Sequence, residues 1–243
     1  MLGAGIAPYP FLMRVIRRTW ASVDVPETDV LFYRGGSRAS VAPRCVVLPV
    51  ADDLPNVGRK TIACFEHVLA RDPFDVIFRT NCSSYVDLPN LRSYASTHAR
   101  LARFYAGSLA THEGVPFASG SGYFLSRDLV ELVVAHQASW DHGVLDDVAL
   151  AALLSRHGIR PEPAPRRDHG GRGEEPPVDT SQFHFRCRTD TWGRLGDARL
   201  MVELHRAFCD ARGEPVPLDL RAAAALERLG RRALALARDR LPS

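Results

Sequence analysis

The chain has 243 residues, enough for one large domain with a substantial core. Hydrophobic residues make up 46% and charged residues 24%, which is the composition of a globular protein and excludes an intrinsically disordered chain. The net charge of +3 comes from 31 Lys and Arg against 28 Asp and Glu, an excess too small to argue for a nucleic-acid partner, although it suits an anionic ligand.

The cysteines indicate a reducing compartment. Five are spread along the chain without a CxxC pair, so neither a zinc site nor a disulfide framework is predicted. We expect reduced thiols in a soluble, cytoplasmic protein. The N-terminus lacks a basic stretch followed by a long apolar one, and no apolar run approaches the ~20 residues that span a bilayer. No membrane span is therefore expected.

Apolar patterning predicts strands and helices in alternation over the first 160 residues. Strands are expected at 1–6, 29–33, 45–50, 75–79 and 122–125. Helices are expected at 12–20, 57–71, 88–97, 127–136 and 146–157, the fourth behind Ser126 as N-cap and the last ended by Gly158. This alternation predicts an α/β fold, a single Rossmann-like domain whose mixed, mainly parallel sheet is flanked by helices.

Two later segments differ in composition. Residues 161–178 are rich in Pro, Gly and charge without periodicity, which predicts a mobile loop, either a lid or a plain insertion. Residues 218–241 are an Ala-, Leu- and Arg-rich amphipathic helix. The expected division is therefore a domain at 1–215 and a helix at 216–243. We expect this helix to pack on its own domain; a dimer contact or a membrane surface are the alternatives.

Polar residues follow one apolar strand abruptly. The strand at 75–79 is followed at once by Thr80 to Ser84, and Arg79 ends it. Parallel sheets bind ligands, commonly nucleotides, at the carboxyl ends of their strands. The sequence therefore predicts a ligand site at the end of this strand.

Five short motifs occur in order between about residues 14 and 190. They are RVIRRTW at 14–20; the spaced residues Asp52, Asn56, Lys60 and Thr61; RTNCSSYVDL at 79–88; SGSGYFLS at 119–126; and Asp146-Asp147-Val148 followed by Gly158-Ile159. Together they resemble the fringe and β-1,3-galactosyltransferase-like glycosyltransferases. The resemblance implies a GT-A fold, a nucleotide-sugar donor, most simply a UDP-sugar, and inverting transfer to an acceptor hydroxyl. It also implies a first strand that is very short or truncated, because Met1 falls where that strand should be finishing.

The chain resembles more closely a bacterial and viral branch with R-T-N-x-S-S-F in place of the family's acidic triplet and a later F-H-[FY]-R, here FHFR at 183–186. In the family that triplet holds a divalent metal. Here its places hold Asn81, Cys82 and Ser83, none a strong ligand for a hard cation. We therefore expect at most weak dependence on Mn²⁺ or Mg²⁺, with His184 as a remnant metal ligand. The diphosphate would be held by His184 and Arg186, helped by Arg79 or Lys60.

The resemblance assigns the general base to Asp147. Asp146 would orient an acceptor hydroxyl or raise the pKa of Asp147 by like-charge repulsion. The alternative is that both carboxylates only stabilise a helix N-terminus. The residues expected at the donor are Lys60, Arg79, Asn81, Ser83, Ser84, Ser119, Gly120, Gly122, His184 and Arg186.

Structural roles remain alternatives for several of these residues. Arg79 could hold its loop internally, Lys60 could lie on a solvated helix, the glycines could only close a tight turn, and His184 could be structural. If 183–186 is extended, His184 and Arg186 share one face.

Two other function classes stay open. One is a catalytically inactive sugar- or partner-binding member of the fold, for which the missing acidic triplet argues. The other is a nucleotidyltransferase on a similar scaffold, although LGAG at 2–5 is a poor phosphate loop. The acceptor is undetermined: a glycan, a natural product, a protein or modified DNA would each suit.

Overall fold

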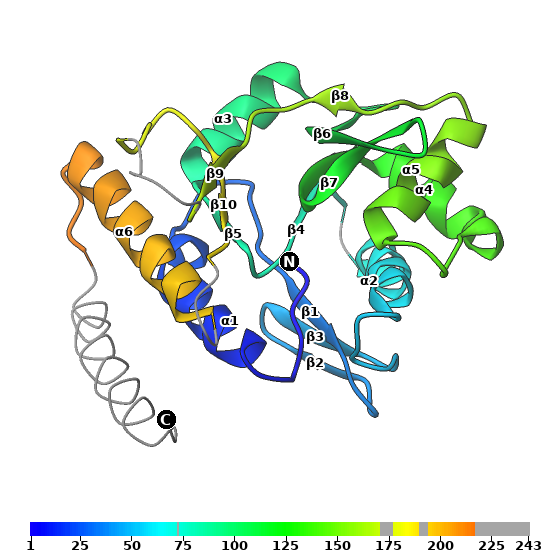
Figure 1. The fold of residues 1–243 in the computed structure, drawn as a ribbon, viewed down its shortest axis with the longest axis horizontal. Helices are drawn as coiled ribbons and strands as arrows, with labels where there is room; N and C mark the ends of the chain where they lie inside the picture. Colours follow the sequence, from blue (N-terminus) through cyan, green and yellow to red (C-terminus); the bar gives the residue numbers. More distant parts are fainter. Residues whose placement is uncertain (72, 171–176, 190–193, 217–243) are drawn as a thin grey trace, which may run out of the picture.

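Figure 1 shows the computed structural model of the chain, which describes residues 1–71, 73–170, 177–189 and 194–216. The amphipathic helix expected at 218–241 lies outside the described residues, and so do residues 171–176 of the expected loop.

The described residues form an α/β fold, as the alternating pattern predicts. The helices are α1 (Tyr9–Arg18), α2 (Val57–Arg71), α3 (Leu88–His98), α4 (Arg127–Ala135), α5 (Asp146–Arg156) and α6 (Leu195–Arg212), with 3₁₀ turns at Trp20–Ser22 and Gln137–Ser139. The strands are β1 (Phe32–Gly35), β2 (Ser40–Ala42), β3 (Cys45–Leu48), β4 (Val76–Thr80), β5 (Ser84–Val86), β6 (Tyr105–His112), β7 (Val115–Ser126), β8 (Glu162–Pro163), β9 (Arg167–His169) and β10 (His184–Cys187).

The N-terminal residues join two groups of strands into one sheet. Leu2 forms parallel bridges with Tyr33 on one side and Asn81 on the other. Its N–H donates to the Thr80 carbonyl at 2.8 Å, and the Gly3 N–H donates to the Tyr33 carbonyl at 2.7 Å. The strand order across the joined sheet is therefore β2, β3, β1, Leu2, β4, β7, β6, β8. The strand expected at 1–6 is present, reduced to a single bridging residue.

The sheet is mixed, as expected, and its antiparallel part is larger than the alternating pattern indicates. β1 and β3 are parallel, but β7 runs antiparallel to both β4 and β6, and β2 runs antiparallel to β3. The cause is a long hairpin, of which the sequence pattern predicted only residues 122–125. Glu113 and Gly114 both have positive φ, the backbone of a tight two-residue hairpin turn, and His112 pairs with Val115 across it.

The segment at 161–178 is not a structureless loop throughout. β8 pairs in parallel with β6, and β9 pairs in parallel with β10. β10 also pairs antiparallel with β5, which forms a second, three-stranded sheet. Strands of two and three residues have no detectable periodicity, and distant strands supply their hydrogen-bond partners. This pairing carries residues 167–169 to the strand that holds His184.

Helices cover the sheet in two groups. Helices α2, α4 and α5 pack against one another, with α4 and α5 on β7 and α2 on β1 and β3, while α1 and α6 lie side by side next to the β5–β10 sheet (Figure 1). The cores beneath them are apolar and aromatic, with fully buried Phe32, Tyr85, Phe124, Phe185 and Phe208 under α1 and α6. Ser126 does occupy the N-cap of α4, but its hydroxyl donates to Asp128 instead of accepting from the helix.

We predict that Gly122→Ala destabilises the packing of β7 against the side chains of His184 and Phe78. A Cβ at Gly122 would lie 2.5 Å from both His184 Cε1 and Phe78 Cζ, so two buried rings would have to shift. We expect a loss of about 1–3 kcal/mol in the free energy of unfolding, measured by urea denaturation. Gly143→Ala in an exposed turn is the control, with a loss below about 1 kcal/mol. Equal losses in the two variants would contradict the packing described.

Candidate functional site

The parallel part of the sheet gathers four strand ends at one edge. β3, β1, the Leu2 bridge and β4 run in the same direction, so their carboxyl ends lie next to one another. Asp52, just beyond β3, accepts hydrogen bonds from the N–H groups of Gly5 and Gly35 and from Lys60 Nζ at 2.9 Å. Burial works against this carboxylate, but the Gly5 N–H and Lys60 outweigh it and lower the pKa of Asp52.

Lys60 therefore does not lie on a solvated helix face. It is buried on α2, and its ammonium is paired with Asp52. Through Asp52, the pair connects α2 to Gly5 and to Gly35 at the end of β1, which is a positioning role. A direct contact between Lys60 and a phosphate would require that pair to open.

Arg79 is a second buried cation of the site. The residue is 4% exposed, and its guanidinium donates to the Gly120 carbonyl at 2.6 Å and to Tyr33 Oη at 3.2 Å. It also forms an ion pair with Asp146. With these contacts made inside the protein, the geometry favours the internal role for Arg79 over a phosphate contact.

The paired carboxylates at the start of α5 have different surroundings. The side chain of Asp146 is 12% exposed and faces Arg79, so it is not placed to orient an acceptor. Its pKa is raised, mainly by burial and further by Asp147, against the opposing effect of Arg79. Asp147 is partly buried and accepts from the Gly120 N–H at 2.7 Å through Oδ2 and from the Val148 N–H at 3.0 Å through Oδ1. Both lie in the first helical turn, where the helix dipole favours negative charge.

We predict that Arg79→Met lowers the free energy of unfolding by about 3–5 kcal/mol, because Asp146 is left buried without its cation. The double variant Arg79→Met/Asp146→Leu should recover part of that loss, since both charges are then removed. Urea denaturation of the two single variants, the double variant and the wild type completes the cycle. A loss below about 1 kcal/mol in Arg79→Met would contradict a buried, coupled pair.

The loop after β4 uses most of its polar groups on the chain itself. Asn81 Nδ2 donates to the Gly120 carbonyl at 3.0 Å, while its Oδ1 accepts from the Ser83 N–H at 2.9 Å. Ser84 is fully buried and donates to the Ser121 carbonyl at 2.7 Å. Ser83 and Ser119 are only partly buried. The loop thus fixes Gly120 and Ser121 beside Asp147. Ser83 and Ser119 are left as the serines closest to solvent.

His184 is buried in the protein and does not reach the surface. It is 1% exposed, lies edge-on to Phe78 and has Nε2 3.2 Å from Ser84 Oγ. Burial, with Arg166 and Arg186 adding to it, lowers the pKa of His184 to about 3. The imidazole is therefore neutral near pH 7 and acts as a hydrogen-bonding support for Ser84. Of the two FHFR residues expected at a phosphate, Arg186 alone has a partly exposed side chain.

We predict that His184 makes folding acid-sensitive. Between the unfolded pKa of 6.5 and the folded value of about 3, the unfolded chain binds more protons, so stability falls as pH drops through this window. The loss is at most about 1.4 kcal/mol per pH unit. Urea denaturation of wild type and His184→Gln at several pH values below about 7 measures the difference in slope.

Two features of the chain serve as controls for that slope. The pKa of His205 is also lowered by burial, but this residue is unchanged in both proteins, so its contribution cancels. His98→Gln removes an exposed histidine from α3 and should keep the wild-type slope. Parallel pH curves for wild type and His184→Gln would contradict a neutral, buried imidazole.

The residues at the family's metal position do not fit a divalent cation. Both polar ends of the Asn81 amide are used within the loop. Cys82 is buried, and burial raises the pKa of its thiol to about 12, so it is not a thiolate. Across the described ranges, no three His, Cys, Asp or Glu side chains are grouped to hold a metal. The expected ligand His184 is enclosed by Phe78 and Gly122.

Two arginines that the motifs did not identify contact this loop. Arg166 Nη1 donates to Ser121 Oγ at 3.0 Å, and Arg194 Nη2 donates to Ser83 Oγ at 2.9 Å. Arg166 lies in the segment predicted as a mobile loop, and Arg194 lies after FHFR at the start of α6. Neither has a spacing that marks it in the sequence. A surplus of arginine after residue 160 is the one signal that could have pointed to them.

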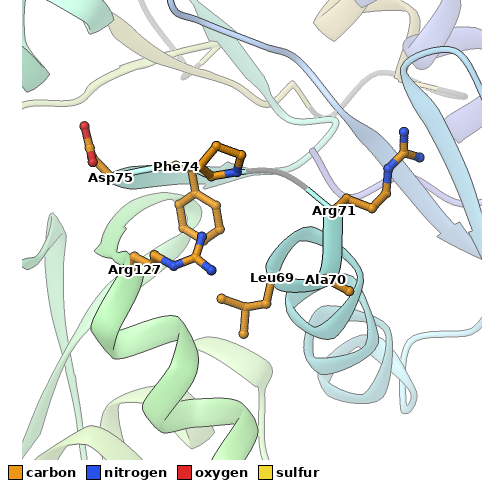
Figure 2. A pocket seen from close by; sticks show the side chains of 7 residues that line it. Leu69, Ala70, Arg71, Phe74, Asp75 and Arg127 are labelled. Atoms are coloured by element: carbon orange, nitrogen blue, oxygen red, sulfur yellow. The ribbon is translucent and has the colours of Figure 1, made fainter.

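A hollow of about 540 Å³ lies elsewhere, between the end of α2 and the start of β4. Figure 2 shows its lining, with the Arg127 guanidinium over the Phe74 ring at 5.0 Å from the centroid. Asp75, just before β4, lines it, so the hollow is at the opposite end of β4 from Arg79 and Thr80. It is separate from the carboxylates of α5.

The chain matches no model of a known protein family and no curated protein sequence. The five motifs are therefore the basis of the glycosyltransferase resemblance. Among the described helices, none is long and apolar enough to cross a membrane.

Proposed function

We propose that the chain is a glycosyltransferase that moves a sugar from a nucleoside diphosphate, with uridine favoured, to an acceptor hydroxyl with inversion. The observation that carries the proposal is the position of Asp147. Its carboxylate is held by the backbone N–H groups of Gly120 and Val148, and the Gly120 carbonyl accepts from Asn81 in the loop that follows β4. A carboxylate fixed next to a strand-end loop suits a general base.

The topology of the parallel strands supports a nucleotide at this edge. Open α/β sheets bind nucleotides outside the carboxyl ends of their parallel strands. Here β3, β1, the Leu2 bridge and β4 end beside one another. Residues of four of the motifs make contacts near this edge, among them Lys60, Asn81, Gly120 and Asp147.

The proposed reaction is one displacement. The acceptor oxygen attacks the anomeric carbon of the sugar as its proton passes to Asp147. The bond from the anomeric carbon to the diphosphate oxygen breaks, and the nucleoside diphosphate leaves with that electron pair. Arg79 and Asp146 act as positioning residues, because Arg79 holds the Gly120 carbonyl while the Gly120 N–H holds Asp147.

We predict that Asp147→Asn lowers turnover by at least about 100-fold and leaves nucleotide binding nearly unchanged, since the amide keeps the shape but accepts no proton. Release of free nucleoside diphosphate measures turnover, and calorimetry measures binding. Asp141→Asn, an exposed carboxylate before α5, is the matched control and should keep the wild-type rate. A near-wild-type rate in Asp147→Asn would remove the base from this residue.

An inactive, ligand-binding member of the fold is the second candidate, because the residues at the family's metal position do not fit a cation. It predicts nucleotide-sugar binding without release of nucleoside diphosphate, whatever acceptor is added. A nucleotidyltransferase, which would release pyrophosphate instead, is less well supported. The N–H groups of Gly3 and Gly5 in LGAG are already bonded to Tyr33 and Asp52.

A further inference from the structure

Three arginines from separate segments gather beside the loop after β4. Arg166 precedes β9 and donates to Ser121, while Arg194 begins α6 and donates to Ser83. Arg186 lies on β10, where it pairs with Ser84 in the antiparallel ladder to β5. The pairing of β9 with β10 and of β10 with β5 brings Arg166 and Arg186 together, and the contact with Ser83 places Arg194 at the same loop.

The carboxylates nearby do not balance these charges. Asp168 forms a two-point ion pair with Arg166, at 2.6 and 3.1 Å, and its side chain is 55% exposed. The same carboxylate is 3.8 Å from Arg186, the closest ion-pair contact of Arg186 among the described residues. Asp197 is fully buried and is taken by Arg194 and by Thr189. Within the described ranges, these three cations therefore face two carboxylates, one of which is shared.

The nearby positive charges act on the guanidinium of Arg186. Burial, and then the charge of Arg166, lowers the pKa of Arg186, while Asp168 opposes them. An anion that contacts this group would relieve both effects, because it supplies negative charge and hydrogen-bond acceptors at once. His184, which lies beneath the loop, is neutral and adds no charge.

We propose that Arg166, Arg186 and Arg194 bind a diphosphate group directly, without a divalent metal. Guanidinium groups match phosphate oxygens with paired N–H donors, and their combined charge takes the place of the cation that the acidic triplet holds in the resembling family. The hydroxyls of Ser83 and Ser121, already held by two of the arginines, complete the polar lining. That the diphosphate belongs to a nucleotide sugar rests on the function proposed above; the anion site itself does not.

The site adjoins the proposed base through two successive residues of β7. The Gly120 N–H contacts Asp147, and the Ser121 hydroxyl contacts Arg166. The Asn81 side chain connects the two sides, since it bonds to both Gly120 and Ser83. A diphosphate on the arginines would therefore lie next to the residues that hold the base.

Calorimetric titration with pyrophosphate, and then with UDP, tests the site in buffer containing EDTA. We expect both to bind the wild-type protein, and Arg186→Gln and Arg166→Gln each to weaken binding at least about tenfold, the effect of losing one charge-assisted hydrogen bond. Arg186→Gln is the informative variant, because it breaks only a 3.8 Å contact and should keep the wild-type melting temperature. Arg199→Gln removes the same charge from an exposed pair on α6 and should change binding less than about twofold.

Three results would overturn the site: no pyrophosphate binding by the wild type, binding that EDTA abolishes and Mn²⁺ restores, or equal binding by Arg186→Gln, Arg166→Gln and wild type. Asp147→Asn should bind pyrophosphate like the wild type. If the arginine variants lose binding but no nucleotide sugar is turned over, the site stands and the proposed function fails. If transfer occurs with full Mn²⁺ dependence and without effect of the arginines, the function stands and the site fails.

Discussion

The buried guanidinium of Arg79 is the contact on which the rest of the site depends. It joins β4 to Tyr33 of β1, to the Gly120 carbonyl of β7 and to Asp146 of α5, four elements that are far apart in the sequence. A charge so deep in a protein is tolerated only when its partners surround it, so the four elements have to be in place together. The position of Asp147 follows, because it is the next residue to Asp146 on the same helical turn.

Much of the architecture was predictable from local pattern. Helix α2 begins and ends where its apolar spacing predicts, and the strand with Arg79 differs from the prediction by one residue. The hairpin of β6 and β7 was missed, because small and polar residues such as those at 118–122 do not look like a strand until neighbours pair with them. The antiparallel direction then follows from the turn at Glu113-Gly114, which no helix-strand alternation reveals.

The site was also predictable only in part, and what the sequence pattern missed again depends on residues that are distant in the sequence. The motifs pointed to the loop after β4, to Gly120 and to Asp146-Asp147, and the structure brings these residues together. They could not show that Arg79 and Lys60 are occupied by carboxylates, or that His184 lies among aromatic rings, because burial depends on residues distant in sequence. Arg166 and Arg194 meet the loop only through the pairing of β5, β10 and β9 and the start of α6, so no spacing marks them.

The one-residue strand at Leu2 has a mechanical consequence. On both sides of it the sheet is held by ladders of several residues, but at this seam the backbone contribution comes from Met1 to Gly3. Side chains bridge the same seam: Arg79 reaches Tyr33 across it, and Asp52 ties Gly5 to Gly35. The elasticity of the sheet at its middle therefore depends on polar side chains as well as on the backbone hydrogen bonds of Met1 to Gly3. A change in any of these contacts would soften the seam while each half of the sheet kept its own stiffness.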